Sequence, residues 1–165
     1  MARVFSFPPI ESNHSRVLVL GTMPGIASLR AMQYYAHPQN AFWKIVSNVF
    51  EFDSSAPYGE RVEYLRSHGV AVWDVLKSCS RPGSLDSNID KTTIVPNDFA
   101  GFFCSHEQIA RVCFNGAAAE SLFTKYVRPN LLAPPTVKFV RLPSTSPANA
   151  SISYKKKLAE WRIIG

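Results

Sequence analysis

The stretch "RVLVLGTMPG" (16–25) is an apolar run that ends in a loop containing glycine and proline. A short run of this kind, closed by Gly21, is typical of a buried β-strand that enters a turn. Three further segments share this character and are also predicted to be strands: "VAVWDVL" (70–76), "RVCFNG" (111–116) and "TVKFVRLP" (136–143). The chain therefore contains at least four strands suited to the interior of a sheet.

Helical patterns lie between and after these strands. In "NAFWKIVSNVF" (40–50), apolar residues recur at helical spacing, which predicts an amphipathic helix. Further helices are expected in "GERVEYLRSHG" (59–69), with Gly69 as its stop signal, in "AAAESLFTKYV" (117–127) and in "SYKKKLAEWRII" (153–164). The alternation predicts an α/β fold, a three-layer α/β/α sandwich around a central, mostly parallel, four-stranded sheet.

The composition fits one packed domain spanning residues 1–165, since 46% of the 165 residues are hydrophobic and 18% are charged. Cys79, Cys104 and Cys113 form no CxxC pair, so we expect reduced thiols, no metal site and no cofactor. The start "MARVFSFPPI" lacks the apolar segment of a signal peptide, and no stretch is long enough for a membrane span. We therefore expect a cytoplasmic protein.

The net charge of +6 is unevenly distributed. Residues 1–110 hold nine Lys/Arg and ten Asp/Glu, a net charge of −1. Residues 111–165 hold nine Lys/Arg but only Glu120 and Glu160, a net charge of +7. Such asymmetry is expected of a face that meets a polyanion, and equally of a solvated basic helix face.

Ligands of open α/β sheets bind at the carboxyl ends of the strands, where "GTMPG" (21–25), Asp74, Asn115 and "LPSTSPANA" (142–150) are predicted to meet. The glycines of "GTMPG" permit a loop that aims backbone amides into a pocket, although an ordinary turn explains them too. Neither P-loop nor GxGxxG spacing is present. A buried carboxylate such as Asp74 either caps a loop or contacts a ligand, whereas Asn115 before Gly116 is more typical of a turn.

Two other segments suggest contacts with a nucleic acid. In "YYAHPQNAFW" (34–43), Tyr34 and Tyr35 are suited to stacking on a nucleobase, or to covering the sheet edge. Asn40 can cap the helix that follows or hold a water molecule against a substrate. The hydroxyl-rich loop at 142–150, between Arg141 and Lys155, suits phosphate contacts but also resembles a common surface loop.

Taken together, "GTMPG", "AHPQNAFWK", "GVAVWDVL", "FNG" and "LPSTSPANA", in this order, resemble the motifs of the uracil-DNA glycosylase superfamily. The resemblance covers residues 16 to about 154. It extends to the mismatch-specific uracil/thymine enzymes and is closer to the hypoxanthine-DNA glycosylase branch, also called DNA-deoxyinosine glycosylase. One position departs from the superfamily pattern. Met23 stands where mismatch-specific relatives carry a catalytic Asn and the classical uracil enzymes an Asp.

The resemblance implies a monofunctional DNA glycosylase that excises a deaminated base, hypoxanthine foremost, from DNA in base excision repair. It implies that Asn40 takes over catalysis by positioning water, and a monomer is the default for such an enzyme. The base-binding residues would be Thr22, Met23, Gly25, Ile26, Tyr34, Tyr35 and Asp74. The DNA-binding residues would be Arg141, Ser144, Thr145, Ser146, Pro147, Asn149 and Lys155.

Three alternatives remain open from the sequence. The same chemistry could act on uracil, or on thymine opposite guanine. The chain could be a DNA-binding module without catalysis. A hydrolase using Ser144 or Ser146 with His37 or His106 is disfavoured because no GxSxG elbow is present. A lyase step is not expected, since no lysine lies in the pocket segments and Lys44 is a full turn into its helix.

Overall fold

The computed structural model describes residues 2–132 and 136–165. Its central sheet consists of four parallel strands in the order β3-β2-β6-β7. These are β2 (Val17–Gly21), β3 (Val70–Asp74), β6 (Arg111–Asn115) and β7 (Lys138–Leu142). The predicted α/β fold with a parallel four-stranded sheet is confirmed.

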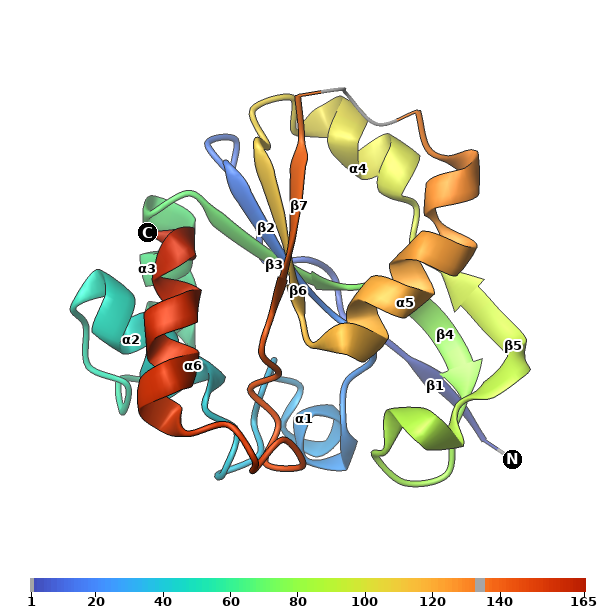
Figure 1. Ribbon diagram of the computed structural model, residues 1–165, viewed down its shortest axis with the longest axis horizontal. Helices are drawn as coiled ribbons and strands as arrows, with labels where there is room; N and C mark the ends of the chain where they lie inside the picture. Colours follow the sequence, from blue (N-terminus) through green and yellow to red (C-terminus); the bar gives the residue numbers. More distant parts are fainter. Residues whose placement is uncertain (1, 133–135) are drawn as a thin grey trace.

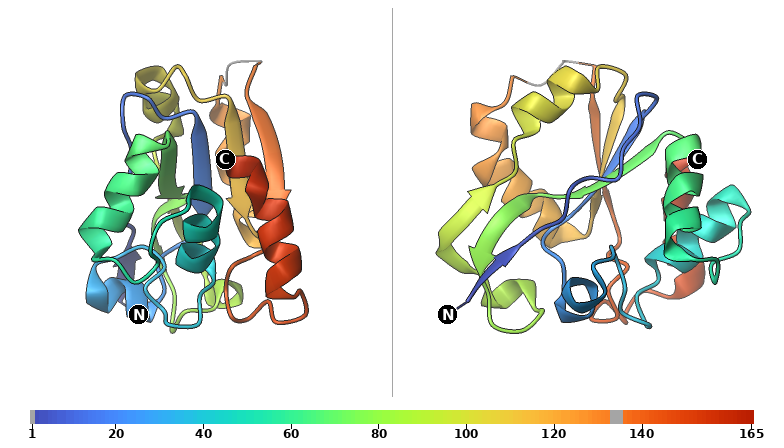
Figure 2. Two further views of the ribbon diagram at one scale, coloured as in Figure 1. Left: turned by 90° about the vertical axis from the view of Figure 1, so that its left-hand side faces the viewer. Right: turned by 180° about the vertical axis from the view of Figure 1, so that it is seen from behind.

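Helices cover both faces of this sheet (Figure 1). One face packs against α4 (Phe99–Ser105) and α5 (Ala117–Tyr126). The other packs against α2 (Phe42–Phe50), α3 (Tyr58–Ser67) and α6 (Tyr154–Trp161). Figure 2, which includes a view from behind, shows the same separation into three layers.

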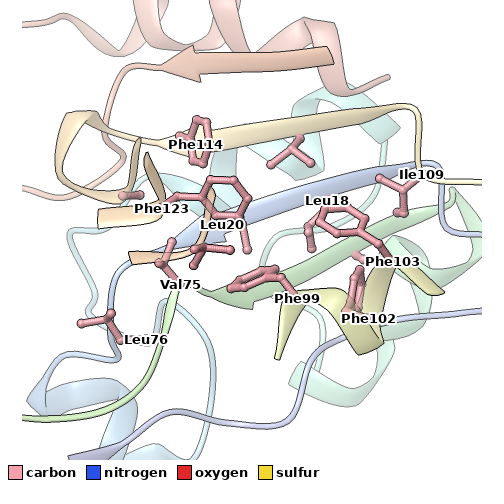
Figure 3. Close-up of a cluster of buried hydrophobic side chains, with 14 of the residues drawn as sticks. Leu18, Leu20, Val75, Leu76, Phe99, Phe102, Phe103, Ile109, Phe114 and Phe123 are labelled. Atoms are coloured by element: carbon pink, nitrogen blue, oxygen red, sulfur yellow. The ribbon is translucent and has the colours of Figure 1, made fainter. Parts of the chain in front are cut away.

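Alternating side chains of the strands feed two cores. Leu18 and Leu20 of β2 belong to the cluster under α4 and α5, whereas Val19 between them belongs to the cluster under α2 and α6. This period of two is expected of a sheet buried on both faces. Figure 3 shows Phe99 and Phe103 of α4 gathered against the face that carries Leu18 and Leu20.

A second, antiparallel sheet was not predicted from the sequence. It has the order β1-β4-β5, with β1 (Arg3–Phe5), β4 (Leu76–Ser80) and β5 (Asp90–Pro96). The strand predicted over 70–76 thus contains all of β3 and the first residue of β4, Leu76. Val75 separates the two strands, and its amide donates to the Gly21 carbonyl at 2.8 Å. The loop between β4 and β5 includes the 3₁₀ turn η1 (Asp86–Asn88).

Several helices differ from their predicted bounds. The α3 helix ends at Ser67 because Gly69 adopts a φ of 72°, outside the helical region. The C-terminal helix stops at Trp161 and continues as the 3₁₀ turn η3 (Arg162–Ile164). The helices α1 (Ile26–Ala31) and α4 and the turn η2 (Arg128–Asn130) were not predicted. Within the described residues, every helix is too short or too polar to cross a bilayer.

Candidate active site

A cavity of about 340 Å³ opens at the carboxyl ends of the parallel strands. The loops after β2, β3, β6 and β7 all contribute to its walls, as the sheet topology predicts. At the lower end of Figure 1, α1, the loop after β7 and the β4–β5 loop gather around this position. The cavity contains most of the predicted site residues: Thr22, Met23, Gly25, Ile26, Tyr34, Tyr35, Asn40, Asp74, Ser144, Thr145, Ser146 and Pro147.

The floor of the cavity depends on a glycine. A Cβ at position 21 would lie 2.6 Å from Asp74 Oδ1 and 2.9 Å from the Tyr35 hydroxyl. Both distances are shorter than a carbon–oxygen contact allows, so no side chain fits there. Gly21 therefore lets two polar groups converge on one point beside the pocket.

The "GTMPG" loop that follows is held by the β4–β5 loop. Thr22 Oγ1 donates to Asp86 Oδ1 at 2.7 Å, and the Ile26 amide donates to Ser84 Oγ at 2.9 Å. The Ile26 amide is consequently not available to a ligand. The amides of Thr22, Met23 and Gly25 donate no hydrogen bond within residues 2–132 and 136–165, so the loop has three amides without a partner, among them those of Met23 and Gly25.

Asp74 and Tyr35 bring unsatisfied polar atoms to the pocket wall. Asp74 is 3% exposed, and neither its Oδ2 nor the Tyr35 hydroxyl has a partner in the described part of the chain. Burial raises the pKa of Asp74 to about 7; the negative charge of Asp86 adds to this shift and Arg81 opposes it. Burial also raises the pKa of Tyr35, with a further contribution from Asp74. Buried polar atoms without partners are costly, which suits groups that await a ligand.

The two adjacent tyrosines have different environments. Tyr34 is 4% exposed, and its hydroxyl donates to the Pro8 carbonyl at 2.9 Å, so its ring belongs to the core. Tyr35 adopts a φ of 54°, uncommon for a residue other than glycine, and its ring stacks on Phe42 at 4.1 Å between centroids. The two tyrosine rings lie 6.3 Å apart between centroids, and the Tyr35 hydroxyl and Asp74 Oδ1 both lie beside Gly21.

Asn40 both contacts the start of α2 and lines the cavity. Its Oδ1 accepts a hydrogen bond from the Phe42 amide at 2.9 Å. This bond fixes the side-chain amide while leaving Nδ2 and a second lone pair of Oδ1 for other partners. The Ala41 amide donates to the Thr145 carbonyl at 3.0 Å, which ties this segment to the loop after β7.

Asn115 holds the loop after β7 against the sheet. Its Nδ2 donates to Thr145 Oγ1 at 2.9 Å, and its Oδ1 accepts from the Thr145 amide at 2.9 Å. Thr145 is 1% exposed, so its hydroxyl faces Asn115 and not the surface. The turn interpretation of Asn115 missed this reciprocal pair, because the pair joins residues 30 positions apart.

Replacing Asn115 with alanine is expected to lower the free energy of unfolding by about 1–3 kcal/mol, because the buried Thr145 amide loses its partner. Thermal and denaturant unfolding of the variant measure this. Thr145→Ser, which retains a hydroxyl for Asn115 Nδ2, serves as the matched control and should be less destabilised. If the unfolding midpoint of Asn115→Ala equals that of the wild type, the hydrogen bonds between Asn115 and Thr145 do not hold the loop.

The remaining predicted DNA-binding residues lie outside this cavity. Arg141 and Asn149 line a neighbouring depression of about 630 Å³, together with Ser144 and Ser146. Lys155 is exposed on the first turn of α6 and lines neither hollow. The basic side chains of Arg141 and Lys155 therefore lie outside the cavity, on β7 and α6.

Sequence reasoning missed the β4–β5 loop as a wall of the site. Ser84, Leu85 and Asp86 line the cavity. Behind them, the buried Arg81 donates from Nε to the Gly83 carbonyl at 2.9 Å and from Nη2 to the Pro24 carbonyl. Polar residues in a surface loop carry no sequence signal that assigns them to a site formed by distant strands.

In the part of the chain that the structure describes, neither Ser144 nor Ser146 forms a hydrogen bond with His37 or His106. His106 directly follows the last residue of α4. Its Nε2 lies 3.0 Å from Glu11 Oε2, and its Nδ1 lies 2.8 Å from the Phe102 carbonyl oxygen. His37 lines the cavity, but its Nδ1 accepts from the Gln39 amide. Across residues 2–132 and 136–165, no group of three or more His, Cys, Asp or Glu side chains is arranged to hold a metal ion.

The fold and the cavity define an α/β/α protein with a small-ligand pocket at its strand ends. A family model for the uracil DNA glycosylase superfamily matches residues 8–163. A hypoxanthine DNA glycosylase from Methanosarcina acetivorans is 33% identical over 159 residues, which cover 96% of this chain and 95% of that protein. A hypoxanthine DNA glycosylase from Methanosarcina barkeri is 35% identical over 111 residues, covering 67% of this chain and 69% of that protein.

The fold is similar to a solved structure as well. The solution NMR structure of a candidate uracil DNA glycosylase from M. acetivorans matches with a TM-score of 0.81 and 30% identity, covering 98% of this chain and 96% of that one. The chain belongs to the uracil DNA glycosylase superfamily. The resemblance expected from the ordered motifs is thus confirmed.

Proposed function

We propose that this chain, acting as one domain, is a monofunctional DNA glycosylase that hydrolyses the N-glycosidic bond of a deaminated base, hypoxanthine, flipped out of DNA. One observation carries the proposal: Asp74 and Tyr35, each with a buried polar atom that has no partner in the described residues, line the same cavity as Asn40. Two relatives bearing the name hypoxanthine DNA glycosylase, each at least 33% identical, support the same substrate.

Cleavage of the N-glycosidic bond depends more on a positioned water than on a strong general base. The reason is that positive charge develops on the sugar while the nucleobase leaves as an anion. Asn40 is held by the Phe42 amide, so its free Nδ2 and lone pair can orient a water toward the sugar. The amides of Met23 and Gly25 are suited to stabilising the negative charge that develops on the base. Met23 itself, with an apolar side chain, contributes to the pocket wall.

Recognition of the base is assigned to Asp74 and Tyr35, which line the same cavity as Asn40. A carboxylate at Asp74 accepts from an N–H, and hypoxanthine carries one at N1. The adjacent Tyr35 hydroxyl can donate to the neighbouring carbonyl. For stacking, Tyr35 is the better of the two tyrosines, because the Tyr34 ring is enclosed by the core.

DNA binding is assigned to the β7–α6 side of the cavity. Arg141, Asn149 and Lys155 would contact phosphates, together with the exposed parts of Ser144, Ser146 and Pro147. Thr145 acts differently, since it anchors the loop through Asn115. We propose that the protein acts as a monomer.

The test is base release from labelled duplexes that carry deoxyinosine, deoxyuridine or a G·T pair, with alkali converting abasic sites to breaks. The proposal predicts release from the deoxyinosine duplex above the other two. Release of uracil or thymine alone would mean that the protein has the substrate specificity of the related uracil or mismatch-specific glycosylases and does not act on hypoxanthine. DNA binding without release from any duplex would favour the non-catalytic binding module.

A further inference from the structure

The three free amides of the "GTMPG" loop share a geometric feature. The peptide groups of this loop are trans, and in a planar trans peptide the carbonyl and the N–H point in opposite directions. A group that holds the carbonyl therefore aims the N–H of the same peptide away from itself. Each free amide of the loop shares its peptide group with a carbonyl that accepts a hydrogen bond, and these carbonyls belong to Gly21, Thr22 and Pro24.

Main-chain groups hold the first two of these carbonyls. The Val75 amide donates to the Gly21 carbonyl at 2.8 Å, and the Leu76 amide donates to the Thr22 carbonyl at 3.2 Å. Both donors lie where β3 passes into β4, so the backbone of the two sheets orients the amides of Thr22 and Met23. These two orientations do not depend on a particular side chain.

The third carbonyl, that of Pro24, is held by a side chain. Arg81 Nη2 donates to it, and Arg81 Nε donates to the Gly83 carbonyl at 2.9 Å, which fixes the guanidinium. Because Pro24 and Gly25 share the peptide group, this contact turns the Gly25 N–H away from Arg81. Gly25 lines the cavity and Arg81 does not. The direction of this amide therefore depends on one side chain behind the loop.

The fold alone gives little reason for an arginine at position 81. The side chain is 4% exposed, and its Nη1 has no partner in residues 2–132 and 136–165. An apolar side chain of similar length would avoid the cost of burying a charge and an unpaired N–H. A guanidinium bound to a carbonyl also polarises the peptide group, which makes the N–H at the other end a stronger donor.

We propose that Arg81 is a positioning residue that aims and strengthens the Gly25 amide as a donor to the base that leaves as an anion. This inference rests on the proposed function and adds to it a residue that does not touch the substrate. A donor of this kind contributes most where the charge on the leaving base is least stable by itself. Loss of Arg81 should therefore harm the release of a poor leaving group more than that of a good one.

The experiment compares Arg81→Met, Arg81→Lys and the control Arg3→Met in single-turnover release from duplexes that carry deoxyinosine or 8-azadeoxyinosine. The additional ring nitrogen of 8-azahypoxanthine stabilises its anion and leaves the N1 edge of the base in place. The rates are measured at pH 9, because the charge of Arg81 lowers the pKa of Asp74 and its removal would otherwise leave less of that carboxyl ionised. Arg3 is the matched control, since its Nη2 donates to the Thr93 carbonyl at 2.8 Å and it lines neither hollow.

Arg81→Met is expected to lose about 10- to 100-fold of the deoxyinosine rate and less than about 5-fold of the 8-azadeoxyinosine rate. Arg81→Lys, which keeps the charge with fewer donors, should lose less than Arg81→Met but again more on deoxyinosine. Arg3→Met should match the wild type on both duplexes. Equal losses on the two duplexes with whichever Arg81 variant folds, or no loss at all, would overturn the positioning role.

A second readout does not depend on catalysis: the amide resonance of Gly25 in nitrogen-15-labelled protein. Free hypoxanthine added at the same pH should move this resonance in the wild type and much less in Arg81→Lys. A wild type in which hypoxanthine moves the resonance, but which releases none from DNA, would contradict the proposed function alone. An equal movement in the wild type and in Arg81→Lys would contradict the positioning role alone.

Discussion

Replacing Asn40 with serine is expected to reduce release of hypoxanthine by at least about 100-fold while leaving the fold intact. The loss follows because serine lacks the amide that would orient water, and misplacement of a reacting group by about 1 Å costs a factor of this size. Serine is nearly as good as asparagine at accepting from the first amides of a helix, so the contact with the Phe42 amide can be retained. Single-turnover release from a deoxyinosine duplex measures the effect.

Asn40→Ala separates the two roles of this side chain. Its rate of hypoxanthine release should fall by the same factor as that of Asn40→Ser. In addition, its free energy of unfolding should fall by about 0.5–2 kcal/mol because the contact with the start of α2 is lost. Thermal unfolding of both variants supplies the comparison. Near-normal release by Asn40→Ser would mean that asparagine at this position only holds the Phe42 amide at the start of α2, whose N-cap residue is Ala41.

The rate of hypoxanthine release is expected to rise with pH through about 7. Burial of Asp74, strengthened by the charge of Asp86, raises the pKa of this carboxyl to about 7, so the acceptor form becomes dominant only above that pH. The pH profile of kcat/KM reports this free-enzyme group. Asp74→Asn should remove the rise between pH 6 and 8 and lower the rate by about 10- to 150-fold, the worth of a hydrogen bond to a charged group.

The contrary result is easy to recognise. A wild-type profile that is flat across this range, or an Asp74→Asn variant that keeps the rise, would show that another group titrates. Asp98→Asn is a suitable matched control, because Asp98 caps α4 through the Gly101 amide, away from the cavity, and should leave the pH profile unchanged.

The same carboxyl is expected to make the fold less stable as the pH rises. Its pKa is higher in the folded protein, at about 7, than its ordinary value of 3.8, so the folded state holds the proton more tightly. The tighter proton binding stabilises the fold fully below about pH 4. This contribution is lost as the pH rises through about 7, which lowers the free energy of unfolding by up to about 4 kcal/mol. Asp74→Asn should therefore unfold at a higher temperature than the wild type at pH 8, with a smaller difference at pH 5. An equal difference at both pH values would contradict this.

The parallel sheet was predictable because its strands carry their own signals. "VLVL" in β2 and "VAVW" in β3 are continuous apolar runs, as a sheet covered on both faces requires. The second sheet lacks them. β1 has three residues, β4 contains Lys77 and three small polar or thiol side chains, and β5 is half-exposed and ends in Pro96. Strands of this kind form through pairing with each other, which no local pattern reveals.

The same difference decides which residues of the site were predictable from the sequence. Asn40, Asp74 and the "GTMPG" loop were found because they directly follow or precede predictable elements, and the strand-end rule brings them together. Ser84, Leu85 and Asp86 were missed because they lie in the loop between β4 and β5 of the second sheet, which carries no strand signal of its own. The distinct surroundings of Tyr34 and Tyr35 depend on the positive φ of Tyr35, which the sequence "YY" does not indicate.

The most direct test of a hydrolytic hypoxanthine-releasing enzyme is to identify both products from a deoxyinosine duplex by mass spectrometry, before any alkali is added. The proposed function predicts free hypoxanthine and an equimolar full-length strand with one abasic site, and neither product with Asn40→Ser. Absence of free hypoxanthine with the wild type would contradict the glycosylase, and a strand already broken at the abasic site would contradict the monofunctional, water-dependent reaction.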